Sequence, residues 1–452
     1  MPAPFGNPSR KDHGRRWLAV SVSLVLLGGI ALPGLFVISD EGPPDIAAFG
    51  PPPPAVGPDV TCFNQAIAKV VGKMPRQLAD KYPPELLARV HAEIQDMIDG
   101  KRERHFVSIS GDYPVIEMVA GYRWDQDVAG ILLQTAAAAG LWQALDEALT
   151  APDDPSFGWG DNKFGSLSRL SSWLTIRLRD ELNKGDSAAA LQSLRRLFLL
   201  GKKLEQNAST FQDWLVSLNI CSETCRLTGK ILPELHAPPG VLCSLAAEIG
   251  RFRPETENAR TAFRGEIVFI NRQKDAIWPD RKHKGMAGLW DNIIFKKNQT
   301  ARLLGECIQD TLRLFARDAG NYAVIKPRVA AMKKSWEVRV ERGRKYIINK
   351  DGWRVVESMN GFYEVISFHV ARSMHSLAQA ALALRTWQAG HGVLPDTLDA
   401  LVPACLPSVP IDYMDGNPIR YWQETGELWT IRRDDLPPGD DDTEYTLRLP
   451  PR

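Results

Sequence analysis

The stretch that decides the fold is LSRLSSWLTIRLRDELNKGDSAAALQSLRRLFLLGKKL, residues 167–204. Leucines recur in it at three- and four-residue spacing, first up to Leu182 and again from Leu191, which is the period of an amphipathic helix. Gly185 stands where a helix C-cap belongs, and Asp186 can cap the next helix. The stretch therefore predicts two antiparallel helices joined by a tight turn, each with an apolar face that needs neighbours.

Similar stripes extend the helical pattern beyond this hairpin. A third stripe of apolar side chains at helical spacing runs from Trp214 to Cys225. Further helices are expected to begin at Pro254, because proline favours the first helical turn, and near Asn292. No 34-residue period recurs, so the chain is not assigned to the tetratricopeptide repeats. We predict a mainly α fold, with a helical bundle or an irregular α-hairpin array over 61–360.

An apolar run without any charged residue, Trp17–Ile38, lies near the N-terminus. At helical rise it reaches about 33 Å, which matches a hydrocarbon core of about 30 Å. We predict that it is a transmembrane helix, preceded by a cytoplasmic basic tail over 1–16. A cleaved signal peptide is the alternative, because Ala47 and Ala48 could serve a peptidase, but its apolar core is usually only about 7–15 residues long.

Basic residues precede this run and acidic residues follow it, which places the N-terminus in the cytoplasm and the bulk of the chain outside. Residues 39–60 include four consecutive prolines, Pro51 to Pro54, and this composition favours an extended linker. We expect a single-pass protein of the bacterial inner membrane. Its partners would be the lipid bilayer, through Trp17–Ile38, and other envelope proteins.

The overall charge is balanced, with 55 basic and 54 acidic residues and a net charge of +1. Such a balance gives no global attraction to nucleic acid, and we expect no such partner. Residues 326–350 depart from it locally, with Glu337 and Glu341 as their only acids. This basic helix either contacts an anionic surface or, as we favour, is a solvated face that pairs with acids elsewhere, such as the acidic tail over 434–444.

Cysteine and histidine are sparse. The six cysteines permit up to three disulfides in 15 pairings, which the sequence leaves open. Cys221 and Cys225 share a helical face and could hold a metal, but the apolar stripe that contains them favours core filling. His369 and His375 lie six residues apart, so they point to different sides of one helix, as core and surface residues rather than a shared ligand set.

No motif of known catalytic chemistry is present: there is no Gly-x-Ser-x-Gly, no His-Glu-x-x-His, no phosphate-binding glycine loop and no Cys-x-x-Cys. We therefore expect a membrane-anchored scaffold or interaction protein of the cell envelope, without catalytic residues. The alternative is an exported hydrolase with a carboxylate-based site. A pocket that collects two acids with perturbed pKa values would favour the hydrolase, and an exposed apolar groove would favour the scaffold.

The C-terminal segment has the most specific local pattern. A long helical pattern over 362–389 ends at Gly390 and Gly392, and no Pro/Gly/Ser linker separates it from the chain before it, so we expect body and C-terminal module to share this helix. A short helix should follow Pro395, then a hairpin with strands over 419–422 and 428–431, and a last strand over 445–449. The spaced elements that follow the helix are Pro395, Leu401-Val402-Pro403, Leu406-Pro407, Val409-Pro410, Asp412, Gly416-Asn417-Pro418 and Arg420-Tyr421.

This order, over residues 375–450, resembles the globular part of the major pseudopilin of type II secretion. The resemblance implies that residues 361–452 form a helix plus a small pseudopilin-like α+β module. In that pseudopilin an acidic loop near the C-terminus binds calcium. For the present protein we expect no cofactor other than such a calcium ion. Four aspartates occupy a similar place here and are the candidate calcium ligands: Asp434, Asp435, Asp440 and Asp441.

One difference from a pseudopilin concerns assembly. In a pseudopilin the apolar helix directly precedes the globular part and carries a glutamate, whereas here more than 300 residues intervene and Trp17–Ile38 contains no acid. We therefore expect no fibre assembly. The whole chain resembles uncharacterised single-pass bacterial envelope proteins that join a helical region to such a module.

Overall fold

The structure is a computed structural model, and it describes residues 62–75, 124–153, 164–277, 296–315, 320–345, 349–358, 361–430 and 446–449, with single positions between 84 and 116. The predicted span Trp17–Ile38, its basic tail and the proline-rich linker lie outside these residues. Among the described helices, none is long and apolar enough by itself to cross a membrane. Two consecutive ones, α5 (Gln126–Ala138) and α6 (Leu141–Thr150), pass that test only as a pair bent by 64°.

The described chain is mainly helical and has one small three-stranded sheet, as the sequence predicts. It divides into two compact units. The larger unit comprises the described parts of 47–269, 308–333 and 361–452, and the smaller unit those of 270–307 and 334–360. Three helices contribute residues to both units: α11 (Thr256–Ile277), α13 (Lys297–Leu314) and α14 (Tyr322–Lys345).

The predicted hairpin of residues 167–204 is confirmed. It consists of α7 (Phe164–Asn183) and α8 (Ser187–Gln206), which pack on each other. Gly185 has a φ of +74°, a left-handed conformation that favours glycine. The Asp186 carboxylate accepts the Ala189 N–H at 3.0 Å and so caps α8. The turn is therefore specified by local residues.

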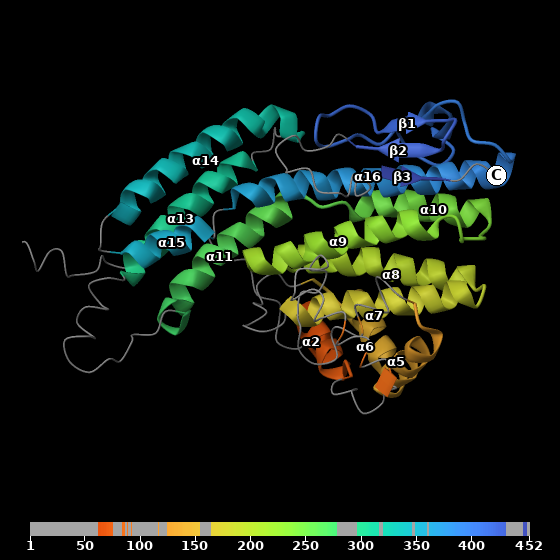
Figure 1. The fold of residues 1–452 in the computed structure, drawn as a ribbon, viewed down its shortest axis with the longest axis horizontal. Coiled ribbons are helices and arrows are strands. Elements are labelled where there is room, and N and C mark those ends of the chain that lie inside the picture. The colour runs from red at the N-terminus through yellow and green to blue at the C-terminus, as the bar shows by residue number, and fades with distance from the viewer. Residues whose placement is uncertain are drawn as a thin grey trace, which may run out of the picture. The chain divides into compact units, whose positions relative to one another are not determined.

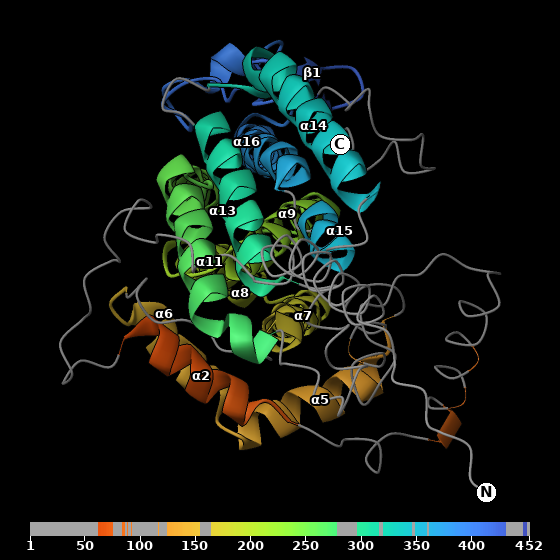
Figure 2. The same ribbon diagram turned by 90° about the vertical axis from the view of Figure 1, so that its left-hand side faces the viewer.

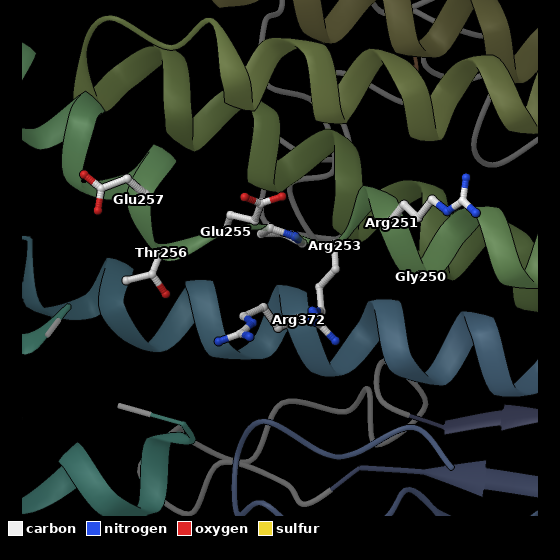
Figure 3. Close-up of a pocket in the computed structure, with 8 residues that line it drawn as sticks. Gly250, Arg251, Arg253, Glu255, Thr256, Glu257 and Arg372 are labelled. Atoms are coloured by element: carbon white, nitrogen blue, oxygen red, sulfur yellow. The ribbon is translucent and has the colours of Figure 1, made fainter. Parts of the chain in front are cut away.

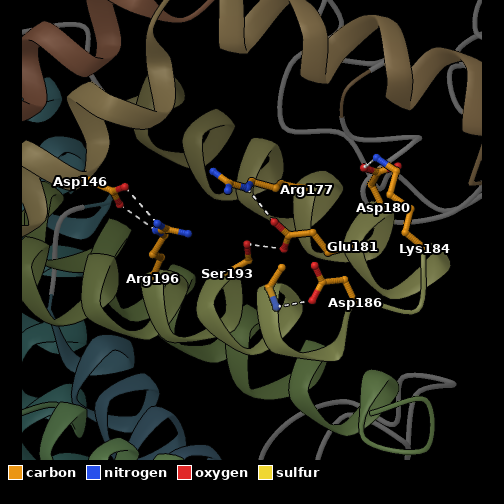
Figure 4. A network of polar contacts seen from close by, with 9 residues as sticks. Asp146, Arg177, Asp180, Glu181, Lys184, Asp186, Ser193 and Arg196 are labelled. Carbon is orange, nitrogen blue, oxygen red and sulfur yellow. Dashed lines mark hydrogen bonds and ion pairs between the residues drawn. The ribbon is translucent and has the colours of Figure 1, made fainter. Parts of the chain in front are cut away.

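Polar contacts hold the hairpin together and join it to α6 (Figure 4). On α7, Arg177 pairs with Glu181 at 2.8 Å, and Ser193 of α8 donates a hydrogen bond to the same carboxylate at 2.6 Å. Arg196 of α8 pairs with Asp146 of α6 at 2.7 Å. Because Arg196 and Asp146 are partly exposed, this ion pair contributes to orientation more than to stability.

Further helices of the larger unit pack in succession on this hairpin. α9 (Phe211–Ile231) packs on α8, and α16 (Phe362–His391) packs on α9 and on α10 (Pro239–Ile249), as Figure 1 shows. At the other side of the hairpin, α2 (Phe63–Lys73) lies beside α6 (Figure 2). The predicted third stripe is confirmed, because the side chains from Trp214 to Cys225 that form it are buried.

In the smaller unit, the predicted basic helix is divided. α14 ends at Lys345 and α15 (Lys350–Ser358) follows. Arg339 pairs with Glu306, and Arg344 pairs with Glu357 at 2.8 Å. Acidic residues of the same unit thus neutralise part of the basic charge, in line with the interpretation of this helix as a solvated face. The acidic tail over 434–444, the other predicted partner, lies outside the described residues.

The sheet near the C-terminus is antiparallel, with the order β1 (Arg420–Trp422), β2 (Glu427–Trp429) and β3 (Thr446–Arg448). Its strands are shorter than predicted, and β2 begins one residue earlier than predicted, because Gly426 makes the turn with a φ of +64° directly before it. The short helix expected after Pro395 is a 3-10 turn, η5 (Leu398–Leu401). Pro403 limits it, because the residue before a proline disfavours helical geometry.

The sheet packs on α16 and on α9 of the helical body. At the contact with α9, a Cβ added to Gly229 would lie 2.1 Å from Cδ2 of Leu447 on β3. The absence of a side chain at Gly229 therefore allows the sheet to approach α9. This arrangement is the one expected if body and module share α16.

We predict that Gly229→Val destabilises the larger unit by about 1–3 kcal/mol, because the new side chain overlaps Leu447 and forces the strand away from α9. The measurement is urea unfolding followed by circular dichroism. Gly130→Val on α5 is the matched control, because no atom lies within 4 Å of a Cβ built there. Equal stability of the two variants would contradict this packing role.

Candidate functional site

A pocket of about 500 Å³ lies in the larger unit between α16 and the connection from α10 to α11. The connection includes the 3-10 turn η4 (Gly250–Phe252). A Cβ at Gly250 would lie 2.6 Å from the Gln379 side chain of α16, so glycine permits η4 to approach that helix. The residues that line the pocket are Gly250, Arg251, Arg253, Pro254, Glu255, Thr256, Glu257 and Arg372 (Figure 3).

Two guanidinium groups of this pocket converge on one aromatic ring. The Cζ atoms of Arg253 and Arg372 lie 5.0 Å and 3.8 Å from the centre of the Tyr413 ring. Burial lowers the pKa of Arg372, and the charge of Arg253 lowers it further, against the stabilising contact with Tyr413. Within the described residues, the buried Nε of Arg372 has no hydrogen-bond partner.

The two carboxylates of the pocket are already paired with other cations. Lys202 of α8 lies 2.6 Å from Glu255. Glu257 faces Arg260 at 3.7 Å and Arg264 at 3.5 Å. Among the described residues, neither carboxylate forms an ion pair with Arg253 or Arg372. The charge of Glu205 raises the pKa of Arg372, but burial outweighs it.

A buried ion pair lies next to the pocket. Lys202 is 3.1 Å from Glu205, and Glu205 also accepts the backbone N–H of Glu255. Burial raises the pKa of Glu205 to about 7, against the opposing effect of Lys202. Burial alone would lower the pKa of Lys202, but Glu205 and Glu255 outweigh it and raise that pKa, so the lysine stays charged. Glu205 is only 1% exposed, so its carboxyl group is separated from solvent.

The cysteines and histidines singled out from the sequence lie in the core of the larger unit. The Sγ of Cys225 is 3.4 Å from Nδ1 of His375, and His369 packs against Phe368. The expectation that one of the two histidines would lie at the surface is wrong, because neighbouring elements cover α16 on several sides and both are 2% exposed. Burial lowers the pKa of each histidine to about 3 and raises that of Cys225.

Two further expectations from the sequence concern disulfide pairing between cysteines and the binding of a metal ion. All six cysteines are free thiols. The Cys243 thiol donates a hydrogen bond to the Ala404 carbonyl at 3.2 Å, and burial, together with Cys243, raises the pKa of Cys405 to about 11. Among the described residues, no group of three or more His, Cys, Asp or Glu side chains is arranged to hold a metal ion. The calcium site stays a prediction, because its four candidate ligands lie outside the described residues: Asp434, Asp435, Asp440 and Asp441.

Sequence reasoning missed the residues of the pocket. The only local signal was the charge-dense segment from Arg251 to Glu257, which includes the predicted helix start at Pro254. No local signal indicated Arg372, because it lies within a helical pattern more than a hundred residues after that segment. The chain matches no known protein family, no curated protein and no solved structure.

A second buried glutamate lies outside the pocket. Glu266 of α11 is 4% exposed and accepts the Phe211 N–H at 3.0 Å. Burial raises its pKa from 4.5 to about 7. The folded state therefore holds a proton at Glu266 that the unfolded state releases. The resulting stability is fully present below about pH 4.5 and is lost as the pH rises through 7.

We predict that Glu266→Gln raises the free energy of unfolding at pH 8 by up to about 3 kcal/mol. Glutamine keeps the acceptor for the Phe211 N–H but carries no charge to bury. At pH 4 the variant and the original protein should be equally stable. Urea unfolding at both pH values is the measurement, with Glu223→Gln, an exposed glutamate of α9, as a control that should show no such gain. A Glu266→Gln gain that does not depend on pH would refute the assignment.

Proposed function

We propose that this protein is a membrane-anchored, extracytoplasmic scaffold or interaction protein of the bacterial cell envelope, and that the arginine-lined pocket is a recognition site. The observation that supports this function best is that the carboxylates of the pocket are paired with cations, whereas two of its arginines are not paired with carboxylates. Glu255 and Glu257 are engaged by cations, while Arg253 and Arg372 form no ion pair with a carboxylate in the described chain. Such a pocket can hold a ligand by charge and hydrogen bonds.

The proposed architecture combines a transmembrane helix over Trp17–Ile38, an irregular α-hairpin array and a pseudopilin-like α+β module at the C-terminus. The apolar run with its basic flank supports the anchor. The order of α16, η5 and the three-stranded sheet supports the module. Protease added to spheroplasts should degrade most of the chain, whereas degradation only after lysis would overturn this orientation.

The scaffold function is tested by capture from intact cells. The tagged full-length protein is cross-linked, solubilised in detergent and purified, and co-purifying proteins are quantified by mass spectrometry. An envelope protein should be enriched with the original chain and with Arg313→Gln, which removes an exposed arginine outside the pocket, and depleted with Arg253→Gln. Equal recovery with all three chains would contradict the role of the pocket. No specific recovery with any of them would contradict the scaffold function.

The second candidate function is a hydrolase, and one observation favours it. Glu205, with a pKa of about 7, accepts the backbone N–H of the pocket residue Glu255. A carboxyl group with that pKa can exchange protons at neutral pH. A hydrolase would cleave a chromogenic ester, glycoside or peptide and lose that activity in Glu205→Gln. No turnover by the original chain, or unchanged turnover in the variant, would contradict this function.

A further inference from the structure

Two positively charged side chains that line the pocket contact the same aromatic ring. Arg253 comes from the connection before α11 and Arg372 from α16, and both guanidinium groups lie over Tyr413. The ring attracts each of them, but their mutual repulsion is evident in the effect of Arg253 on the pKa of Arg372. A negative group between them would relieve this repulsion.

We propose that the pocket binds a ligand through one oxyanion, a phosphate or carboxylate group held between Arg253 and Arg372. This inference rests on the proposed recognition function of the same pocket. Guanidinium groups present planar pairs of N–H donors that match both kinds of oxyanion. Both side chains line the pocket, and Figure 3 shows Arg253 reaching from the connection to α16, the helix that carries Arg372.

The size and charge of the pocket restrict the ligand further. A volume of about 500 Å³ falls in the range of sites for small organic molecules, so the oxyanion is one end of a larger ligand. The side chains of Glu255 and Glu257 are 61% and 62% exposed at the same pocket. Their cationic partners offset their charge, so the oxyanion between the two arginines is the part of the ligand that this pocket specifies.

Calorimetric titration of the detergent-solubilised full-length protein tests this inference. Inorganic phosphate, methyl phosphate and acetate are the probes. We expect 1:1 binding of at least one probe, and about tenfold weaker binding in Arg253→Gln, because one charge-assisted contact is lost. Binding should also weaken as salt is raised. Preference for the phosphates would identify a phosphoryl ligand, and preference for acetate a carboxylate ligand.

One control variant, one further test variant and one stability measurement complete the experiment. Arg313→Gln removes the same charge outside the pocket and should bind as the original protein does. Arg372→Lys keeps the charge but lacks the planar donor pair, so it should also bind more weakly. Arg253 is only half-buried, so Arg253→Gln should keep the original unfolding midpoint without ligand, which separates lost binding from lost folding.

Several outcomes decide the question. No binding of any probe at tens of millimolar, or equal affinity of Arg253→Gln and the original protein, would overturn the inference. Oxyanion binding without capture of an envelope protein would contradict the proposed scaffold function and support this inference. Capture without oxyanion binding would support the scaffold function and refute the oxyanion site.

Discussion

Trp214→Ala should lower the free energy of unfolding by about 3–5 kcal/mol. Trp214 is fully buried in the larger unit, and its ring centre lies between 5.5 and 6.1 Å from those of four phenylalanines. Truncation would remove the hydrophobic contribution of the indole and leave a cavity that the neighbouring rings fill only in part. The four phenylalanines are Phe211, Phe263, Phe315 and Phe368.

Urea unfolding followed by circular dichroism measures this effect. Trp422→Ala is the matched control, because the Trp422 side chain of β1 is 55% exposed, and it should cost less than about 1 kcal/mol. If the two substitutions had equal effects, Trp214 would not be a central part of the core.

Lys202→Met should also be strongly destabilising, by about 3–5 kcal/mol at pH 8. The substitution leaves the Glu205 carboxylate buried without its cation, and desolvation then raises its pKa above the value of about 7 that it has beside Lys202. A carboxyl group whose pKa is higher in the folded than in the unfolded state stabilises the folded protein at low pH, and this contribution is lost as the pH rises. The loss should therefore be smaller at pH 5, where Glu205 is protonated.

A second substitution separates charge from packing. Glu205→Gln removes the buried charge but keeps an acceptor for the Glu255 N–H. In the double variant with Lys202→Met, most of the stability at pH 8 should return, and the dependence on pH should flatten. A single Lys202→Met variant as stable as the original protein at pH 8 would refute the role of this ion pair.

Local patterns predicted individual elements well. The turn between α7 and α8 follows from Gly185 and Asp186, because a left-handed glycine and a capping carboxylate act on neighbouring backbone groups. The start of α16 at Phe362 followed from the helical spacing, and the hairpin of β1 and β2 followed from the turn residues before and between its strands. Their bounds shifted by one or two residues where Gly392 and Gly426 turn with positive φ.

The amino-acid sequence by itself determined the mainly helical fold, the hairpin and the small sheet, because capping, turn geometry and apolar period act over a few residues. Only the tertiary structure decided the pocket. Lys202 contacts Glu255, which is 53 residues later in the sequence, and Arg253 lies near Arg372, which is more than a hundred residues later. Such encounters depend on how α8, η4 and α16 pack, for example through the close approach at Gly250. No local pattern encodes that packing, because it results from the summed contacts of the whole core.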